Sequence, residues 1–156
     1  MNNEITPISV AFYIVPLMNA LIRVGTMPEK ERLFLALIDG HKLVPCLKRG
    51  AKGTLEEVAI ESLRECTNAK AKQDRITNQM VEDLEVKIFK YDLLDNKVLF
   101  VRLEDEDDYP SEVVGLCSMK LAAKYKHPTI IARMNDEGFD RGSARGLNQS
   151  ALVDFK

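Results

Sequence analysis

The sequence predicts an α/β (α+β) chain with a helical N-terminal part, a long connecting helix, and then a small mixed β-sheet with one packed helix. Apolar residues recur with helical spacing between positions 26 and 84, whereas short alternating runs of β-branched and aromatic residues follow position 85. An amphipathic stretch separates two of those runs. We therefore divide the chain into residues 1–53, the connecting helix 54–84, and a sheet-bearing part 85–156.

The first part is predicted to contain at least one capped helix. Apolar residues 8–14 form either a short strand or the start of a helix, and this run ends at Pro16. Thr26 with Glu29 three positions later is typical of a capping box, with a proline in the first turn. The apolar face that follows ends at Gly40, where we expect the helix to stop.

A long helix is predicted to follow a basic loop. Residues 47–53 hold two glycines and three cations, which favours a flexible loop. Thr54 with Glu57 is a second capping box, and neither Gly nor Pro interrupts residues 54–84. A helix of that length spans about 45 Å and usually connects two packed units. Its polar face carries three cations that either follow a nucleic-acid backbone or are ordinary solvated charges: Lys70, Lys72 and Arg75.

The last part is predicted to form a sheet with a helix packed on it. Residues 86–90 and 98–103 alternate like strands, and residues 112–125 form a helix. Residues 128–134 read as a buried strand, and residues 139–145 return after a turn. The order strand, strand, helix, strand, strand is typical of a small α/β sheet.

Composition and charge narrow the class of protein. The chain has 156 residues, of which 46% are hydrophobic and 29% charged, as in ordinary globular domains. No apolar run approaches the roughly 18 residues of a membrane span, and the N-terminus lacks the pattern of a secretory signal. Three cysteines without CxxC spacing argue against a disulfide framework or a zinc site. We expect a cytoplasmic protein with reduced thiols and no membrane partner.

A hydroxyl and a guanidinium lie between two glycines near the end of the sequence. The segment Gly-Ser-Ala-Arg-Gly at 142–146 predicts a turn whose freed backbone N–H groups bind an anion while the arginine offers a bidentate fork. The alternative is a β-turn whose glycines serve only the backbone. We predict that this turn binds a substrate phosphate through Gly142, Ser143, Arg145 and Gly146.

Two segments resemble the DHH phosphoesterase superfamily, in particular its RecJ-type single-strand-specific exonucleases. Residues 115–133 followed by the 142–146 segment resemble the DHHA1 domain. Residues 16–25 resemble the P-R-I-N-A-A-G-R-L-G segment that closes the catalytic domain of RecJ-type enzymes. This second match departs at Leu17 and Ile22, where the family usually has Arg and Gly.

The resemblance implies how the parts of the chain are used. Residues 1–53 would end a catalytic DHH-type domain, residues 54–84 would connect it to the next domain, and residues 85–156 would be a C-terminally truncated DHHA1 domain that binds substrate. Asn19 and Arg23, which match the family segment, would then join the 142–146 turn in binding phosphate.

The family's catalytic metal ligands, including an Asp-His-His triplet, lie N-terminal to the region this chain covers. The sequence holds only His41 and His127, and its acidic run at 104–108 lacks ligand spacing. The resemblance therefore implies a fragment with no catalytic residue and no metal of its own, inactive alone. Mn²⁺ or Mg²⁺ would bind in the full-length enzyme through ligands in the missing domain.

The expected function of the whole protein is a 5′→3′ exonuclease that hydrolyses single-stranded DNA, with this fragment supplying substrate binding. One alternative is a DHH-family phosphodiesterase for oligoribonucleotides or cyclic dinucleotides. Another is a non-catalytic nucleic-acid-binding module, which would also describe a fragment without the metal site.

Overall fold

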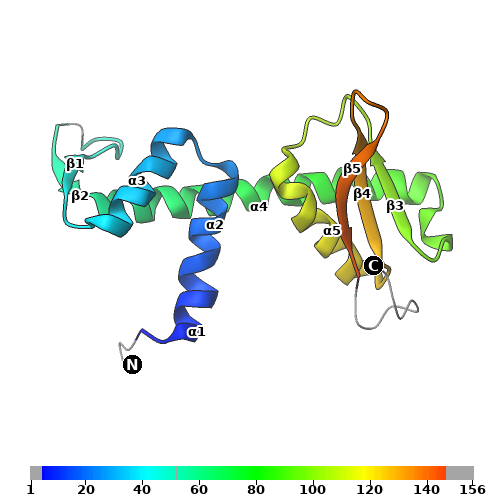
Figure 1. Ribbon diagram of the computed structural model, residues 1–156, viewed down its shortest axis with the longest axis horizontal. Coiled ribbons are helices and arrows are strands. Elements are labelled where there is room, and N and C mark those ends of the chain that lie inside the picture. Colours follow the sequence, from blue (N-terminus) through cyan, green and yellow to red (C-terminus); the bar gives the residue numbers. More distant parts are fainter. Residues whose placement is uncertain (1–4, 52, 147–156) are drawn as a thin grey trace. The chain divides into compact units, whose positions relative to one another are not determined.

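The computed structural model describes residues 5–51 and 53–146, and the chain divides into two compact units, Met1–Gln73 and Asp74–Lys156. Helix α4, Val58–Lys90, begins in the first unit and ends in the second (Figure 1). The predicted α+β class is confirmed: helices, one long connecting helix and two small sheets make up the described chain.

The N-terminal apolar segment is helical. Helix α1, Pro7–Ser9, continues into a π-helical turn, Val10–Ile14, and then into α2, Val15–Val24. The Thr6 hydroxyl caps the first turn by accepting the N–H of the third helical residue at 3.1 Å. Gly25 ends the helix, and its N–H donates to a carbonyl in the preceding turn at 2.8 Å.

The helical residues Pro7–Val24 are long and apolar enough to cross a membrane by length and composition alone. The expectation that no segment approaches this length was therefore wrong. The reason is that the polar positions within it are few and only Arg23 is charged, so the average stays apolar without one unbroken run. Ala20 and Leu21 are fully buried within the first unit, whereas Phe12 and Tyr13 are largely exposed.

The core of the first unit forms between α2, α3 and the first turns of α4. Helix α3, Met27–Ile38, has the predicted capping box: the Thr26 N–H donates to the Glu29 carboxylate at 2.6 Å. The Arg32 Nε donates to Glu65 of α4 at 2.8 Å. Only Leu33 of the predicted apolar face of α3 is buried, and it packs in a cluster with Leu21, Cys66 and Ala69.

A two-stranded antiparallel sheet precedes α4. Strand β1, Leu43–Pro45, pairs with β2, Leu55–Glu57, and α4 starts only after β2. The predicted capping box at Thr54 is therefore wrong, because the residues that would form the first helical turn pair with β1 instead. The Thr54 hydroxyl donates to the Ala51 carbonyl at 2.7 Å within the connecting loop.

Helix α4 also includes residues that were predicted to form a strand. Residues 86–90 form its last turns, and Met80, Leu84 and Ile88, each four positions apart, are fully buried. This spacing places all three on one helical face. The apolar residues at 86 and 88 imitate a strand, but Val86 is largely exposed, so only the helical period accounts for the burial pattern.

The second unit contains a mixed three-stranded sheet in the order β3-β4-β5. Strand β3, Leu99–Leu103, runs parallel to β4, Thr129–Met134, and helix α5, Ser111–Tyr125, connects them. Strand β5, Asp140–Arg145, returns antiparallel to β4. The predicted strand at 98–103, helix at 112–125 and strand at 128–134 are confirmed.

One face of this sheet is buried. Leu99, Val101 and Leu103 of β3 are at most 4% exposed, whereas Phe100, on the other face, is 42% exposed. Helix α5 packs against β4 and β5 and buries Val113, Cys117 and Leu121. Met80, Leu84 and Ile88 of α4 are also fully buried in this unit. Cys117 of α5 is fully buried, and burial raises the pKa of its thiol to about 11.

Candidate phosphate-binding site

The predicted returning strand at 139–145 is confirmed as β5, and it includes most of the segment that was also predicted to be a glycine-flanked turn. Residues 142–145 belong to β5, and Gly146 follows its last residue. The turn lies earlier, where the Asn135 N–H donates to the Phe139 carbonyl at 2.8 Å and Gly138 has a φ of 80°. Pairing with β4 therefore holds the backbone extended, and the predicted concavity of N–H groups between two glycines is wrong.

Gly142 has a packing role in this strand. A Cβ at this position would lie 1.9 Å from the Ile131 carbonyl oxygen and 2.6 Å from the Ala132 Cα. No side chain fits in that space, so glycine lets β4 and β5 approach. Gly142 thus fixes the position of the residues that follow it.

Ser143 and Arg145 do lie together, next to a position on helix α5 that has no side chain. In the ladder Ser143 pairs with Ile131, and Arg145, two residues later, points to the same face of the sheet. A Cβ on Gly115 of α5 would lie 3.2 Å from the Ser143 Oγ and 2.9 Å from the Arg145 Nη2. The absence of a side chain at position 115 therefore leaves the space that the hydroxyl and the guanidinium occupy.

A cavity of about 220 Å³ adjoins Ser143. The start of α5 contributes Ser111 and Val114 to its lining, and β5 contributes Arg141 and Ser143. The remaining lining residues are Leu103, Tyr109, Arg133 and Gly142. Arg141, Ser143 and Arg145 alternate along β5, so three polar side chains follow one another on the face that carries the cavity.

Guanidinium groups dominate the charge of this cavity. Arg133 pairs with Arg141 across the ladder, and its Nη2 donates to the Asp107 carbonyl. Among the described residues nothing accepts a hydrogen bond from the buried Arg133 Nε. Burial, and then the hydrogen bond to Asp83, raises the pKa of Tyr109, so this phenol stays neutral. An anion would meet two arginines, and an oxyanion accepts readily from such donors.

The other predicted phosphate ligands lie in the first unit. Asn19 is exposed on α2, and the half-buried Arg23 follows one turn later. The Arg23 Nη1 donates a long hydrogen bond, 3.5 Å, to the Gln73 Oε1. A joint site with Ser143 and Arg145 remains a prediction.

The three cations predicted to follow a nucleic-acid strand lie on α4. The Lys72 ammonium donates to the Val24 carbonyl at 3.0 Å and so stabilises the C-terminal end of α2. Arg75 is exposed, and Lys70 is half-buried. Lys72 thus has a structural contact that the sequence did not reveal.

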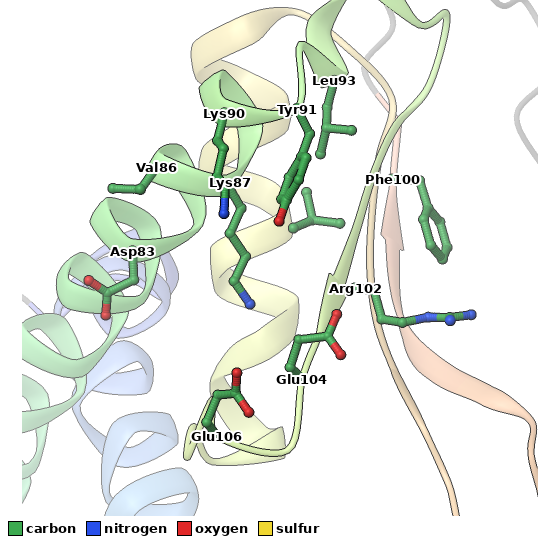
Figure 2. Close-up of a pocket in the computed structure, with 11 residues that line it drawn as sticks. Asp83, Val86, Lys87, Lys90, Tyr91, Leu93, Phe100, Arg102, Glu104 and Glu106 are labelled. Carbon is green, nitrogen blue, oxygen red and sulfur yellow. The ribbon is translucent and has the colours of Figure 1, made fainter.

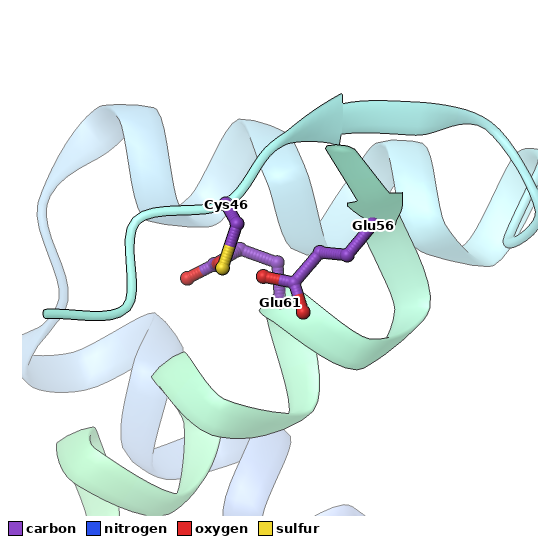
Figure 3. A group of neighbouring side chains, drawn as sticks. All are labelled: Cys46, Glu56 and Glu61. Atoms are coloured by element: carbon purple, nitrogen blue, oxygen red, sulfur yellow. The ribbon is translucent and has the colours of Figure 1, made fainter. Parts of the chain in front are cut away.

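Cys46, Glu56 and Glu61 bring possible metal-ligand atoms within 4.8 Å of one another (Figure 3). Arg64 already joins the two carboxylates, at 2.7 Å from Glu56 and 2.5 Å from Glu61, and the Leu47 N–H donates to Glu61 at 3.1 Å. The hydrogen bond from the Arg64 guanidinium is the largest cause that lowers the pKa of Glu56, to about 2. The guanidinium occupies the place that a cation would take, which favours a structural ion-pair network.

Four residues of this site were not predicted from the sequence: Tyr109, Gly115, Arg133 and Arg141. The period of two along β5 is the signal that could have placed Arg141 beside Ser143. Arg133 required the β4–β5 register, and Tyr109 lies in a loop without any pattern. The contact of Gly115 with β5 depends on how α5 packs, which a sequence does not reveal.

The chain is similar to two proteins whose names describe a single-strand DNA-specific exonuclease. No family model matches the chain. It is 38% identical over 149 residues to the "Putative SPbeta prophage-derived single-strand DNA-specific exonuclease YorK" of Bacillus subtilis (strain 168). The corresponding protein of Bacillus phage SPbeta matches equally. The alignment covers 93% of this chain but only 26% of each relative, so the chain spans about a quarter of their length.

Proposed function

We propose that this chain is the substrate-binding fragment of a RecJ-like 5′→3′ exonuclease that hydrolyses single-stranded DNA, and that it acts in the cytoplasm. The observation that carries the proposal is the hydroxyl and guanidinium of Ser143 and Arg145 gathered against Gly115. The similarity to YorK supports the nuclease class. The resemblance of the 115–146 region to a DHHA1 domain supports the same assignment.

In this proposal the second unit holds a phosphate of the substrate strand. Arg145 supplies a fixed pair of N–H donors, and Ser143 supplies a hydroxyl that rotates to meet an oxygen. Arg141 and Arg133 extend the positive charge into the adjacent cavity. A terminal phosphate carries more charge than an internal diester, so we expect this site to prefer a 5′-phosphorylated strand.

The hydrolytic step belongs to a part of the enzyme outside this chain. In RecJ-type enzymes, Mn²⁺ or Mg²⁺ would activate water and stabilise the leaving oxygen. The Cys46 cluster does not suit these ions, which prefer several oxygen ligands, since Arg64 already neutralises its carboxylates. The contribution of this chain is therefore to bind and orient the strand.

Fluorescence anisotropy with a 5′-phosphorylated oligothymidylate tests the proposal. We expect binding to the isolated chain, about tenfold or more loss with Arg145→Ala, and no release of nucleotides with Mn²⁺. Arg49→Ala, in the loop of the first unit, is the matched control, because it also removes one positive charge. Equal weakening by both variants would mean nonspecific attraction, and a preference for cyclic dinucleotides over the oligonucleotide would favour the phosphodiesterase alternative.

A further inference from the structure

Strand β3 lies at one edge of its sheet, and its outer side has no partner strand in residues 5–51 and 53–146. Leu99 turns its N–H toward β4, donating to the Pro128 carbonyl at 2.8 Å. Successive residues of a strand alternate in direction, so Phe100 and Arg102 turn their N–H and C=O groups outward. This edge therefore presents backbone donors and acceptors at the spacing that another strand requires.

A groove of about 580 Å³ follows this edge between β3 and the last turns of α4. Figure 2 shows Lys87 and Tyr91 on the α4 side of β3, and Phe100 and Arg102 on its far side. The groove thus reaches both faces of the strand. An extended polypeptide beside β3 would project its side chains alternately toward these two faces.

Acidic and basic residues line the groove in equal numbers, and those without an ion pair in the described chain lie at different ends of it. Six charged residues line it: Asp83, Lys87, Lys90, Arg102, Glu104 and Glu106. Lys87 pairs with Asp107, and Arg102 with Asp140 at 2.6 Å. In the described part of the chain, Lys90, Glu104 and Glu106 form no ion pair. The Lys90 ammonium lies 5.0 Å from the centre of the Tyr91 ring. Lys90 and Glu106 lie toward opposite ends of the groove (Figure 2).

We propose that this groove binds an extended segment of a partner protein, which adds to the sheet as an antiparallel strand beside β3. The sequence Leu-Phe-Val-Arg-Leu of β3 has no proline, glycine or unpaired charge to protect an exposed edge. The balanced charges disfavour a nucleic-acid strand, which needs excess cations. An antiparallel segment would place a basic residue near Glu104 and Glu106 and, toward its C-terminal end, an acidic residue near Lys90.

Two synthetic peptides test this proposal, which does not rest on the nuclease function. Both are acetylated and amidated and share a Val-Thr-Val-Thr centre; one begins with Lys and ends with Glu, and the other reverses these charges. In NMR titrations of the ¹⁵N-labelled chain, the Lys-first peptide should protect the amides of Phe100 and Arg102 from solvent exchange. It should bind about tenfold more tightly than the reversed peptide, and N-methylation of its alternate backbone amides should abolish binding.

Two variants give the matched comparison on the protein. Phe100→Pro removes an outward N–H without breaking the β4 ladder, and should abolish binding; Phe100→Val keeps that N–H and should retain it. The proposal is overturned if neither charge order binds at about 1 mM, a concentration that detects very weak complexes. The proposal is also overturned if the Phe100 and Arg102 amides are already protected from solvent exchange in the free monomer. A third contrary result is that oligothymidylate shifts the NMR signals of these two amides and the peptide does not.

Discussion

Replacing Gly115 with alanine would test whether the phosphate site depends on the absence of a side chain at position 115 of α5. The added Cβ would lie 2.9 Å from the Arg145 Nη2 and 3.2 Å from the Ser143 Oγ, so both groups must move by a few tenths of an ångström or more. The atom met first is the far end of a flexible side chain, so the fold can adapt. The substitution should therefore change the site and leave the helix intact.

The expected magnitudes separate binding from stability. Alanine is better than glycine in a helix interior by about 0.5–1 kcal/mol, which offsets the cost of moving the two side chains. Loss of one charge-assisted hydrogen bond to a phosphate costs about 1.5–3 kcal/mol. We therefore expect the Kd for a 5′-phosphorylated oligothymidylate to rise roughly 10-fold to 150-fold, while the free energy of unfolding changes by less than about 1 kcal/mol.

Anisotropy titrations and urea unfolding would measure the two quantities. A double-mutant cycle is the control: in an Arg145→Ala background, Gly115→Ala should have a much smaller further effect on binding, because the guanidinium, the group nearest to the added Cβ, is already gone. An unchanged Kd in the single variant would show that the added Cβ does not disturb the phosphate-binding groups. The same loss of affinity in both backgrounds would show that Gly115 acts independently of Arg145.

Three further predictions concern the core, the ion-pair network and the strand path. Leu121→Ala, at a fully buried site, should lower the free energy of unfolding by about 2–5 kcal/mol, whereas Met119→Ala on the exposed side of α5 should change it by under about 0.5 kcal/mol; equal effects would contradict the packing. Glu56→Gln should lower the free energy of unfolding at pH 7, as measured by urea unfolding. The difference from the unchanged chain should shrink as pH falls from 4.5 toward 2, because the lowered pKa of Glu56 stabilises the fold only while the carboxylate is charged. A difference in the free energy of unfolding that does not depend on pH would argue against the ion pair with Arg64. If α4 follows the nucleic-acid strand, Arg75→Gln should reduce the slope of log K against log salt by about 0.7, and an unchanged slope would place the strand elsewhere.

Much of the fold was accessible from local patterns. The capping box at Thr26, the uninterrupted connecting helix and the strand at 128–134 each follow from spacing and composition within one segment. The errors arose where two patterns compete. Val86 and Ile88 alternate as in a strand, but both belong to α4, where only Ile88 lies on the buried face. Thr54 is a residue type that caps helices, but the residues after it pair with β1 and form a strand.

The candidate site was accessible only in part. Ser143 and Arg145 were found by residue type, but the backbone around them was predicted to be a turn because two glycines flank them. Gly142 serves the close approach of β4, a contact between residues that register alone brings together. The contributions of Gly115 and Arg133 depend on tertiary packing, so no local pattern could have indicated them.

Arg145 is the residue that we propose holds a phosphate of the substrate strand. The most direct test is to follow the side-chain ¹H–¹⁵Nε signals of the arginines by NMR while titrating 5′-phosphorylated oligothymidylate into the chain. We predict that the Arg145 signal shifts first and furthest, that those of Arg133 and Arg141 follow, and that the 5′-hydroxyl oligonucleotide produces a smaller change. An Arg145 signal that stays fixed while the strand binds would show that Arg145 does not hold the phosphate.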